Sequence, residues 1–133
     1  MARPDDTNPA TTPYVNLTTY RRDGRAVTTP VWLVARGERF YVGTTSTTGK
    51  TKRIRANGRV RFVPCDGRGR REFGQAYAGT ARIVDDAALR NDVRRMLVRK
   101  YGRLVFAMIM AIYWLRGQYR YRAVLELICH PAA

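Results

Sequence analysis

Short alternating segments separated by turn residues constrain the fold of this 133-residue chain more than any other feature. In residues 14–20 (YVNLTTY) the side chains of Val15, Leu17 and Thr19 share one face of an extended strand, and a hairpin turn (RRDG) follows at 21–24. Further strands are predicted at 25–35, 39–45, 59–64, 73–84 and 119–129. Because strands and helices do not alternate, the pattern favours a mainly β, six-stranded antiparallel barrel with a few helices over a parallel sheet.

Pro30 stands in the middle of the second predicted strand, 25–35. Proline has no N–H to donate to a strand ladder, so this strand is expected at a sheet edge or with a bulge. The residues beside the proline are Thr28, Thr29, Val31 and Trp32. Unpaired backbone groups at this position would suit a planar ligand with polar edges. The alternative is an ordinary edge strand with Val31 and Leu33 in the core.

Residues 43–60 (GTTSTTGKTKRIRANGRV) lead from the third predicted strand into a short basic helix that stops at Asn57-Gly58. The backbone N–H groups at a helix start attract anions, so a phosphate-binding turn is predicted here. On the helix Lys50 and Arg53 share one face, so only one pair of cations can hold a given ligand directly. The other pair is Lys52 and Arg55. A solvated basic turn is the alternative, since no complete P-loop motif is present.

Length and charge bound the function classes. The chain is long enough for one core, and we expect a flexible N-terminal arm at 1–12 and a single domain at 13–133. The formal net charge of +15 favours an anionic partner. Nucleic acid, a phosphorylated or polycarboxylate small molecule, and a lipid surface all meet that condition.

Cysteine and histidine usage argues against a metal site or a disulfide framework. Cys65 and Cys129 lie far apart, and His130 is the single histidine of the sequence. A reducing cytoplasm is therefore expected, and the N-terminal residues lack the apolar run of a secretory signal. Cys65 has Arg68 nearby in sequence, but a buried structural cysteine is the preferred interpretation over a reactive thiol.

The C-terminal half is predicted to contain helices before its last strand. A helix over 87–100, capped by Asp85 or Asp86, would place Leu89, Val93, Met96 and Leu97 on one face. The apolar run 104–115 (LVFAMIMAIYWL) is too short to span a membrane, which takes about 20 residues. We interpret it as a buried helix or a subunit interface in preference to a membrane contact.

Several segments together resemble a known family. They are 14–32 (YVNLTTYRRDGRAVTTPVW), 41–70 (YVGTTSTTGKTKRIRANGRVRFVPCDGRGR), 79–86 (GTARIVDD) and 93–102 (VRRMLVRKYG). This succession resembles the split β-barrel flavin and deazaflavin oxidoreductases, which are relatives of pyridoxamine 5′-phosphate oxidase. The most specific parts are Thr29 to Trp32, the basic helix from Gly49 to Arg55, and Pro64-Cys65-Asp66, which favour the branch that uses coenzyme F420.

The resemblance implies an FMN-binding split barrel fold, a homodimer, and a cofactor at the subunit interface. The cofactor would be coenzyme F420, or alternatively FMN, and the activity would be hydride transfer to or from a small electron-poor organic substrate. The phosphate or carboxylates would be held by Thr44, Thr45, Ser46, Gly49, Lys50 and Arg53, with Lys52 and Arg55 as an outer ring. The ring system would lie against Thr28, Thr29, Pro30, Val31 and Trp32. Which hydroxyl contacts the phosphate stays open, because residues 46–50 depart from the family's usual pattern.

No catalytic acid or base is indicated by the sequence, which suits a reaction in which the cofactor carries the chemistry. A proton would come from solvent, Tyr77 or Tyr41, although both tyrosines fit core or rim positions better. Two other functions stay open: an FMN- or haem-binding protein of the same fold without turnover, and a nucleic-acid-binding barrel. The second is disfavoured because most strand aromatics alternate into apolar positions.

Overall fold

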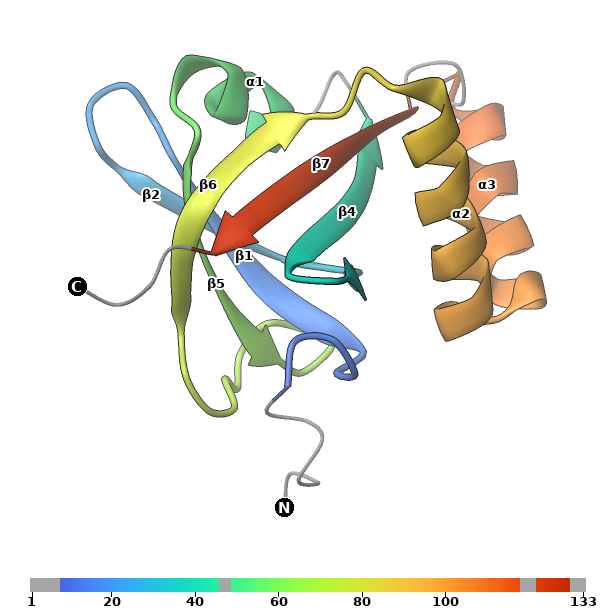
Figure 1. Cartoon of the computed structure of the whole chain (residues 1–133), viewed down its shortest axis with the longest axis horizontal. Coiled ribbons are helices and arrows are strands. Elements are labelled where there is room, and N and C mark those ends of the chain that lie inside the picture. Colours follow the sequence, from blue (N-terminus) through green and yellow to red (C-terminus); the bar gives the residue numbers. More distant parts are fainter. Residues whose placement is uncertain (1–7, 46–48, 118–121, 130–133) are drawn as a thin grey trace.

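A computed structural model describes residues 8–45, 49–117 and 122–129. One antiparallel sheet contains the seven strands β1 (Tyr14–Tyr20), β2 (Ala26–Val31), β3 (Val34–Arg36), β4 (Arg39–Thr45), β5 (Arg59–Cys65), β6 (Tyr77–Ile83) and β7 (Arg122–Cys129). The strand order is β2-β1-β5-β6-β7-β4-β3, and Figure 1 shows the sheet curled into a barrel. The predicted split barrel is confirmed, with seven strands instead of six.

Three helices accompany the sheet: α1 (Gly49–Ala56), α2 (Ala87–Tyr101) and α3 (Arg103–Leu115). In Figure 1, α1 lies at the end of the barrel near the β1–β2 hairpin, whereas α2 and α3 lie side by side at another side of the barrel. Among the described residues, no helix combines the length and the apolar character needed to cross a membrane. Helix α1 and the α2–α3 pair therefore cover two different parts of the barrel surface. The sequence alone did not distinguish these two parts.

The seventh strand arises because the predicted strand 25–35 is broken at Trp32 and Leu33. The Leu33 N–H donates to the Tyr101 hydroxyl at 3.1 Å, and the Leu33 carbonyl accepts from Lys100 Nζ at 2.5 Å. Side chains from the last turn of α2 thus satisfy backbone groups that a neighbouring strand would otherwise bond. The prediction of one continuous strand was wrong for this reason.

Strand β2 is an edge strand, as its proline predicts. Pro30 lies opposite Asn16 of β1, and in the described part of the chain β2 pairs with no other strand. Val31 and Leu33 are both buried, as expected for an ordinary edge strand with two core residues. Pro30 therefore marks the free edge, and no bulge is needed to explain it.

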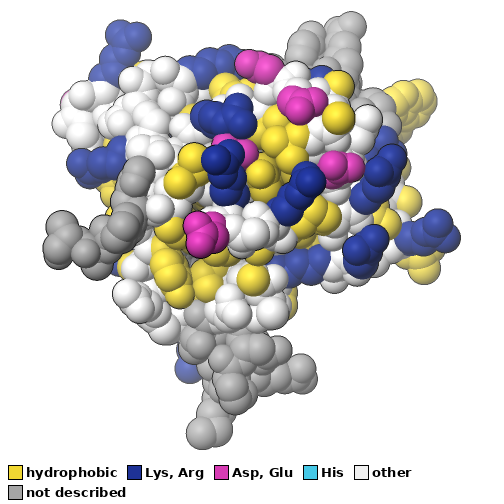
Figure 2. All heavy atoms as spheres, viewed as in Figure 1, with side chains coloured by type: hydrophobic (Ala, Val, Ile, Leu, Met, Phe, Trp, Pro, Cys, Tyr) yellow, Lys and Arg dark blue, Asp and Glu magenta, His cyan; other side chains and the backbone are white. Residues whose placement is uncertain are grey.

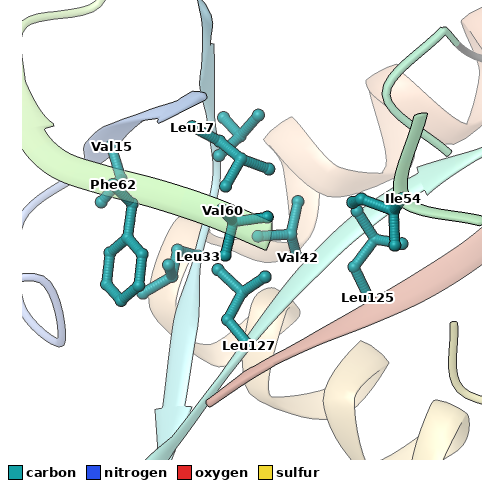
Figure 3. Close-up of a cluster of buried hydrophobic side chains, with 10 residues drawn as sticks. Val15, Leu17, Leu33, Val42, Ile54, Val60, Phe62, Leu125 and Leu127 are labelled. Atoms are coloured by element: carbon teal, nitrogen blue, oxygen red, sulfur yellow. The ribbon is translucent and has the colours of Figure 1, made fainter. Parts of the chain in front are cut away.

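The barrel interior is filled by side chains from both ends of the chain, as Figure 3 shows for nine labelled residues. The cluster comprises Val15, Leu17, Val31, Leu33, Val42, Ile54, Val60, Phe62, Leu125 and Leu127. Burying one such side chain contributes about 1.5–3 kcal/mol. Ile54 is the member from α1, so the barrel core itself fixes the position of the basic helix.

A second cluster packs α2 against the outer face of the sheet. Its buried members are Val34, Tyr41, Val84, Val93, Leu97, Phe106 and Val124. Asp86 caps α2 by accepting a hydrogen bond from the Ala88 N–H at 2.9 Å, and Gly102 ends the helix with a φ of 95°. The predicted helix over 87–100 and its Asp86 cap are confirmed.

Helix α3 is not the buried helix that its composition suggested. Leu104 is 88% exposed and Trp114 is 69% exposed, and Phe106 is the one residue of the described α3 side chains that is buried. The remaining exposed large side chains are Val105, Met108, Ile112 and Leu115. One face of α3 lies near α2, and the opposite face is exposed to solvent. The interpretation of α3 as a subunit interface therefore stays a proposal.

Other predicted boundaries differ from expectation or fall outside the described residues. The predicted strand 73–84 is shorter, since residues 66–76 form a loop that Asn16 Nδ2 holds through the Gly69 carbonyl at 2.9 Å. The last predicted strand begins at Arg122, and residues 118–121 lie outside the described residues. Residues 1–7 of the expected arm also lie outside them, while Thr12 is already buried.

Candidate functional site: a basic groove beside helix α1

A groove lined mainly by cations lies between helix α1 and the β1–β2 hairpin. It has a volume of about 470 Å³ and is lined by Tyr20, Arg21, Arg22, Asp23, Arg25, Lys52, Arg53 and Ala56. We call it the basic groove. Thr51 and Ile54 of α1 are buried against the barrel, so the opposite side of the helix presents its cations to this groove.

The charges of the basic groove are poorly balanced. Asp23 is its one carboxylate, and it pairs with Arg25 at 2.7 Å between Arg25 Nε and Asp23 Oδ2. Within residues 8–45, 49–117 and 122–129, the other four cations take part in no ion pair. A further cation, Arg59, lies 4.0 Å from the ring centre of Tyr20. This field favours a ligand that carries more than one negative charge.

Arg53 is the best-positioned cation of the groove. Its Nε donates to the Thr19 hydroxyl at 2.6 Å, and Thr19 is held on the buried face of β1. Its guanidinium lies so close to Gly49 that a Cβ there would come within 2.7 Å of Arg53 Nη1. Glycine at position 49 therefore lets the arginine fold back over the start of the helix.

Burial and mutual repulsion act on the cations of α1. Burial lowers the pKa of Lys50, and the neighbouring charge of Arg53 lowers it further. Burial also lowers the pKa of Arg53, with a second contribution from the charge of Arg21. A bound anion would relieve this repulsion, so the local electrostatics favour anion binding at this end of the barrel.

The lining of the basic groove does not follow the two pairs that helical spacing predicts for the cations of α1. Lys52 and Arg53 line the basic groove together, Lys50 is half-buried outside its lining, and Arg55 is exposed. The arginines of the hairpin, Arg21, Arg22 and Arg25, were not among the predicted site residues. The segment RRDGR did identify a turn, and its high charge was the signal that this turn could complete an anion site.

The residues predicted to line the cofactor ring do not form one wall within a single chain. The Thr28 hydroxyl is 2.7 Å from the Thr18 hydroxyl on the outer face of the sheet, whereas Val31 points into the barrel core. Trp32 is half-buried and stacks on Tyr101, with ring centres 4.2 Å apart and planes inclined by 4°. Strand alternation separates these side chains, as it does in any extended segment.

A second cavity lies under helices α2 and α3 and has a volume of about 340 Å³. We call it the helix-side cavity. Trp32 and Thr44 line it, so these two predicted residues lie apart from the cations of the basic groove. The side chain of Thr45 and all of Ser46 lie outside the described residues. One chain thus presents the predicted site residues in two places.

The candidate proton donors are engaged elsewhere. The Tyr41 hydroxyl donates to Glu126 Oε2 at 3.0 Å, and the Tyr77 ring stacks on Phe62 with centres 5.5 Å apart. Neither tyrosine lines the basic groove or the helix-side cavity. His130 lies outside the described residues. No group in the described structure is therefore assigned as a catalytic acid or base.

Cys65 is a buried structural cysteine, as predicted. Burial raises the pKa of its thiol to about 11, and the charges of Asp66 and Glu72 act in the same direction. A thiol with this pKa is not a nucleophile at neutral pH. Among the described residues, no three His, Cys, Asp or Glu side chains gather into a set that would hold a metal ion.

The surface in Figure 2 shows Lys and Arg side chains spread over the face, with hydrophobic side chains between them. The positive charge on this face is dispersed over several elements. The basic groove is therefore distinguished by its shortage of balancing carboxylates, and not by charge alone.

Comparison with known proteins identifies the family. Residues 8–128 match the family described as pyridoxamine 5′-phosphate oxidase. The chain belongs to this family. No curated protein sequence matches it.

Three solved structures illustrate the likeness. An F420 reductase is 18% identical with a TM-score of 0.63, covering 98% of this chain and 97% of its own. A conserved hypothetical protein from Mycobacterium tuberculosis is 17% identical with a TM-score of 0.69, and the match covers 98% of this chain and 82% of that protein. The haem storage protein HutZ from Vibrio cholerae is 15% identical with a TM-score of 0.68, and the match covers 90% of this chain and 83% of HutZ. At these identities the likeness establishes the fold alone.

Proposed function

We propose that this protein is an oxidoreductase that binds coenzyme F420 and transfers a hydride between it and a small electron-poor organic substrate. The observation that carries the proposal is the basic groove, where Lys52 and Arg53 of α1 meet Arg21 and Arg22 of the hairpin. Membership of the pyridoxamine 5′-phosphate oxidase family and the fold shared with an F420 reductase support it.

The donor set fits the acidic end of this cofactor. Coenzyme F420 has a riboflavin-like core and a phosphate-linked lactyl oligoglutamate tail, so its tail carries several negative charges. Hydrogen bonds to charged groups contribute roughly 1.5–3 kcal/mol each, and less where the cation is exposed, as Lys52 is. Two or three such contacts would favour F420 over FMN, which ends in a single phosphate.

The chain's own residues would orient the cofactor and exclude water. The free edge of β2 beside Thr28, Thr29 and Pro30 offers backbone groups to the polar rim of the ring. When bound in its reduced form, the deazaflavin would supply the hydride from carbon 5. The proposed set around the phosphate and tail is completed by Gly49, Lys50, Arg55, Thr45 and Ser46. Thr44, which was also predicted for this set, lines the helix-side cavity instead.

We further propose that the protein acts as a homodimer with its cofactor sites at the subunit interface. The basic groove and the segment ending at Trp32 are separate within one chain, and a second copy would be needed to bring such surfaces together. The exposed face of α3, with Met108 and Trp114, is a candidate contact surface. Both cysteines are unpaired, which agrees with the proposed location in a reducing cytoplasm.

A second candidate is a haem- or FMN-binding protein of the same fold without turnover, because the haem storage protein HutZ shares the fold. Titration of the purified protein with haemin, FMN and F420 separates the two candidates. A Soret shift with haemin, or saturable binding of FMN alone, would favour the second candidate.

The test of the main proposal is cofactor binding by three variants, followed through quenching of F420 fluorescence. Arg53→Ala and Lys50→Ala are expected to weaken binding at least tenfold, whereas Arg99→Ala is the matched control. Arg99 is an exposed arginine of α2 and lines neither the basic groove nor the helix-side cavity. If Arg53→Ala and Lys50→Ala both bound F420 like the unmodified protein, the assigned site would be wrong.

A further inference from the structure

The helix-side cavity has a polar end and an apolar end. Its lining residues are Trp32, Gly43, Thr44, Ala87, Arg90, Asn91, Arg94, Leu97, Phe106, Ile109, Met110, Ala123 and Val124. On α2 the lining positions recur every three or four residues, so one stripe of the helix faces the cavity. Along that stripe Ala87 comes first, arginine and asparagine follow at positions 90, 91 and 94, and leucine follows at position 97.

The apolar end is built from residues of the hydrophobic core. Leu97, Phe106 and Val124 belong to the buried cluster between the helices and the sheet. At Gly43 the chain carries no side chain, and a Cβ there would lie 3.2 Å from Leu97 Cδ1. The floor is therefore formed partly by backbone, with Trp32 held in place by its stacking on Tyr101.

The polar end carries two arginines without a carboxylate partner in the described structure. Arg90 and Arg94 are exposed, four residues apart on α2, and form none of the ion pairs found among residues 8–45, 49–117 and 122–129. Asp92, the acidic residue of this helix, pairs instead with Arg36 and Arg95. Two like charges at one end of an apolar cavity suit an anionic group that bridges them.

We propose that the helix-side cavity binds an amphipathic anion, a carboxylate on an unbranched apolar body such as a medium-chain fatty acid. The carboxylate would lie between Arg90 and Arg94, and the chain would run along Leu97 toward Phe106. A volume of about 340 Å³ falls at the small end of the range for small-molecule sites, roughly 300–1,000 Å³. The helix-side cavity lies apart from the basic groove, and two of its lining residues, Trp32 and Thr44, also belong to the set proposed to contact the cofactor.

Tryptophan fluorescence gives a direct test, since the sequence contains two tryptophans and one of them lines the cavity. In the variant Trp114→Phe, Trp32 is the remaining tryptophan. Titration with decanoate is expected to shift the Trp32 emission saturably, whereas butyrate, which lacks the apolar body, is expected to leave it unchanged. Decyltrimethylammonium, which has the same tail with the opposite charge, should bind at least tenfold more weakly than decanoate.

The arginines are tested by charge-removing variants in the same background. The double variant, which carries Arg90→Gln and Arg94→Gln together, is expected to weaken decanoate binding roughly tenfold and to leave decanol binding unchanged. Arg99→Gln removes the same charge from an exposed part of α2 outside the cavity and should not change the affinity. The proposal is overturned if decanoate leaves the Trp32 emission unchanged, or if the Arg99 variant loses as much affinity as the double variant.

Discussion

Replacing Glu126 tests how the structure holds β7 in the sheet. The Glu126 side chain is 1% exposed and accepts hydrogen bonds from Arg82 Nε at 2.8 Å, Arg39 Nη1 at 3.2 Å and the Tyr41 hydroxyl at 3.0 Å. In Glu126→Gln the amide group would face at least one of these donors with its own N–H. A buried donor left unbonded costs about 1–3 kcal/mol, and each ion pair with a half-exposed arginine adds at most about 1 kcal/mol.

We therefore expect Glu126→Gln to lower the free energy of unfolding by about 2–4 kcal/mol at pH 7. Urea unfolding followed by circular dichroism measures it, with Glu38→Gln, an exposed turn residue, as the control. Burial alone raises the pKa of Glu126, but the hydrogen bonds from Arg82 and Tyr41 outweigh it, so the pKa lies below its ordinary value. This stabilisation is present above the ordinary carboxyl pKa and is lost as the pH falls through the lower folded-state pKa. Equal stabilities of the variant and the unmodified protein at pH 7 would refute the reasoning.

Three further predictions concern α2 and α3. Tyr101→Phe should lower the free energy of unfolding by about 1–2 kcal/mol, measured in urea, because the Leu33 N–H loses its acceptor while the stacking on Trp32 is kept. Burial lowers the Lys100 pKa to about 8, so protein stability should rise from pH 8 toward pH 10, and Lys100→Met should flatten that rise in urea titrations. If α3 forms the proposed dimer contact, Met108→Asp should shift the sedimentation coefficient to that of a monomer, whereas an unchanged value would exclude this face.

The sequence predicted most strands and the main helix because their signals are local. Alternation placed Val15 and Leu17 in the barrel, Pro30 marked an edge strand, and Asp86 marked a helix start. Each of these depends on the residue itself and its immediate neighbours, which is the information that a single sequence carries.

The failures involve partners distant in sequence. The break after Val31 depends on Lys100 and Tyr101, about 70 positions away, which bond the backbone of Leu33. The position of α3 could not be read from its composition, since an apolar run is consistent with a core or with an interface. Its exposure becomes visible only when the rest of the chain is in place.

The sequence pointed to some of the cations that border the basic groove, and the binding role of all of them stays a prediction. The sequence identified α1 as a source of cations, but Arg21 and Arg22 join it only because the β1–β2 hairpin folds beside the helix. Helical spacing alone grouped Lys50 with Arg53. In the structure the packing of α1 on the barrel determines which cations border the basic groove, and these are Lys52 and Arg53. The spacing of residues along a helix determines which side chains share a face, but only the packing of the helix determines which parts of the protein that face contacts.

The most direct test of the central claim compares two ligands on the unmodified protein. Coenzyme F420 and the deazaflavin riboside without phosphate or tail share one ring system, so their dissociation constants differ only through the acidic end. If the basic groove holds that end, F420 should bind at least tenfold more tightly at low salt, and the advantage should shrink at high salt. Equal affinities at both salt concentrations would contradict the account.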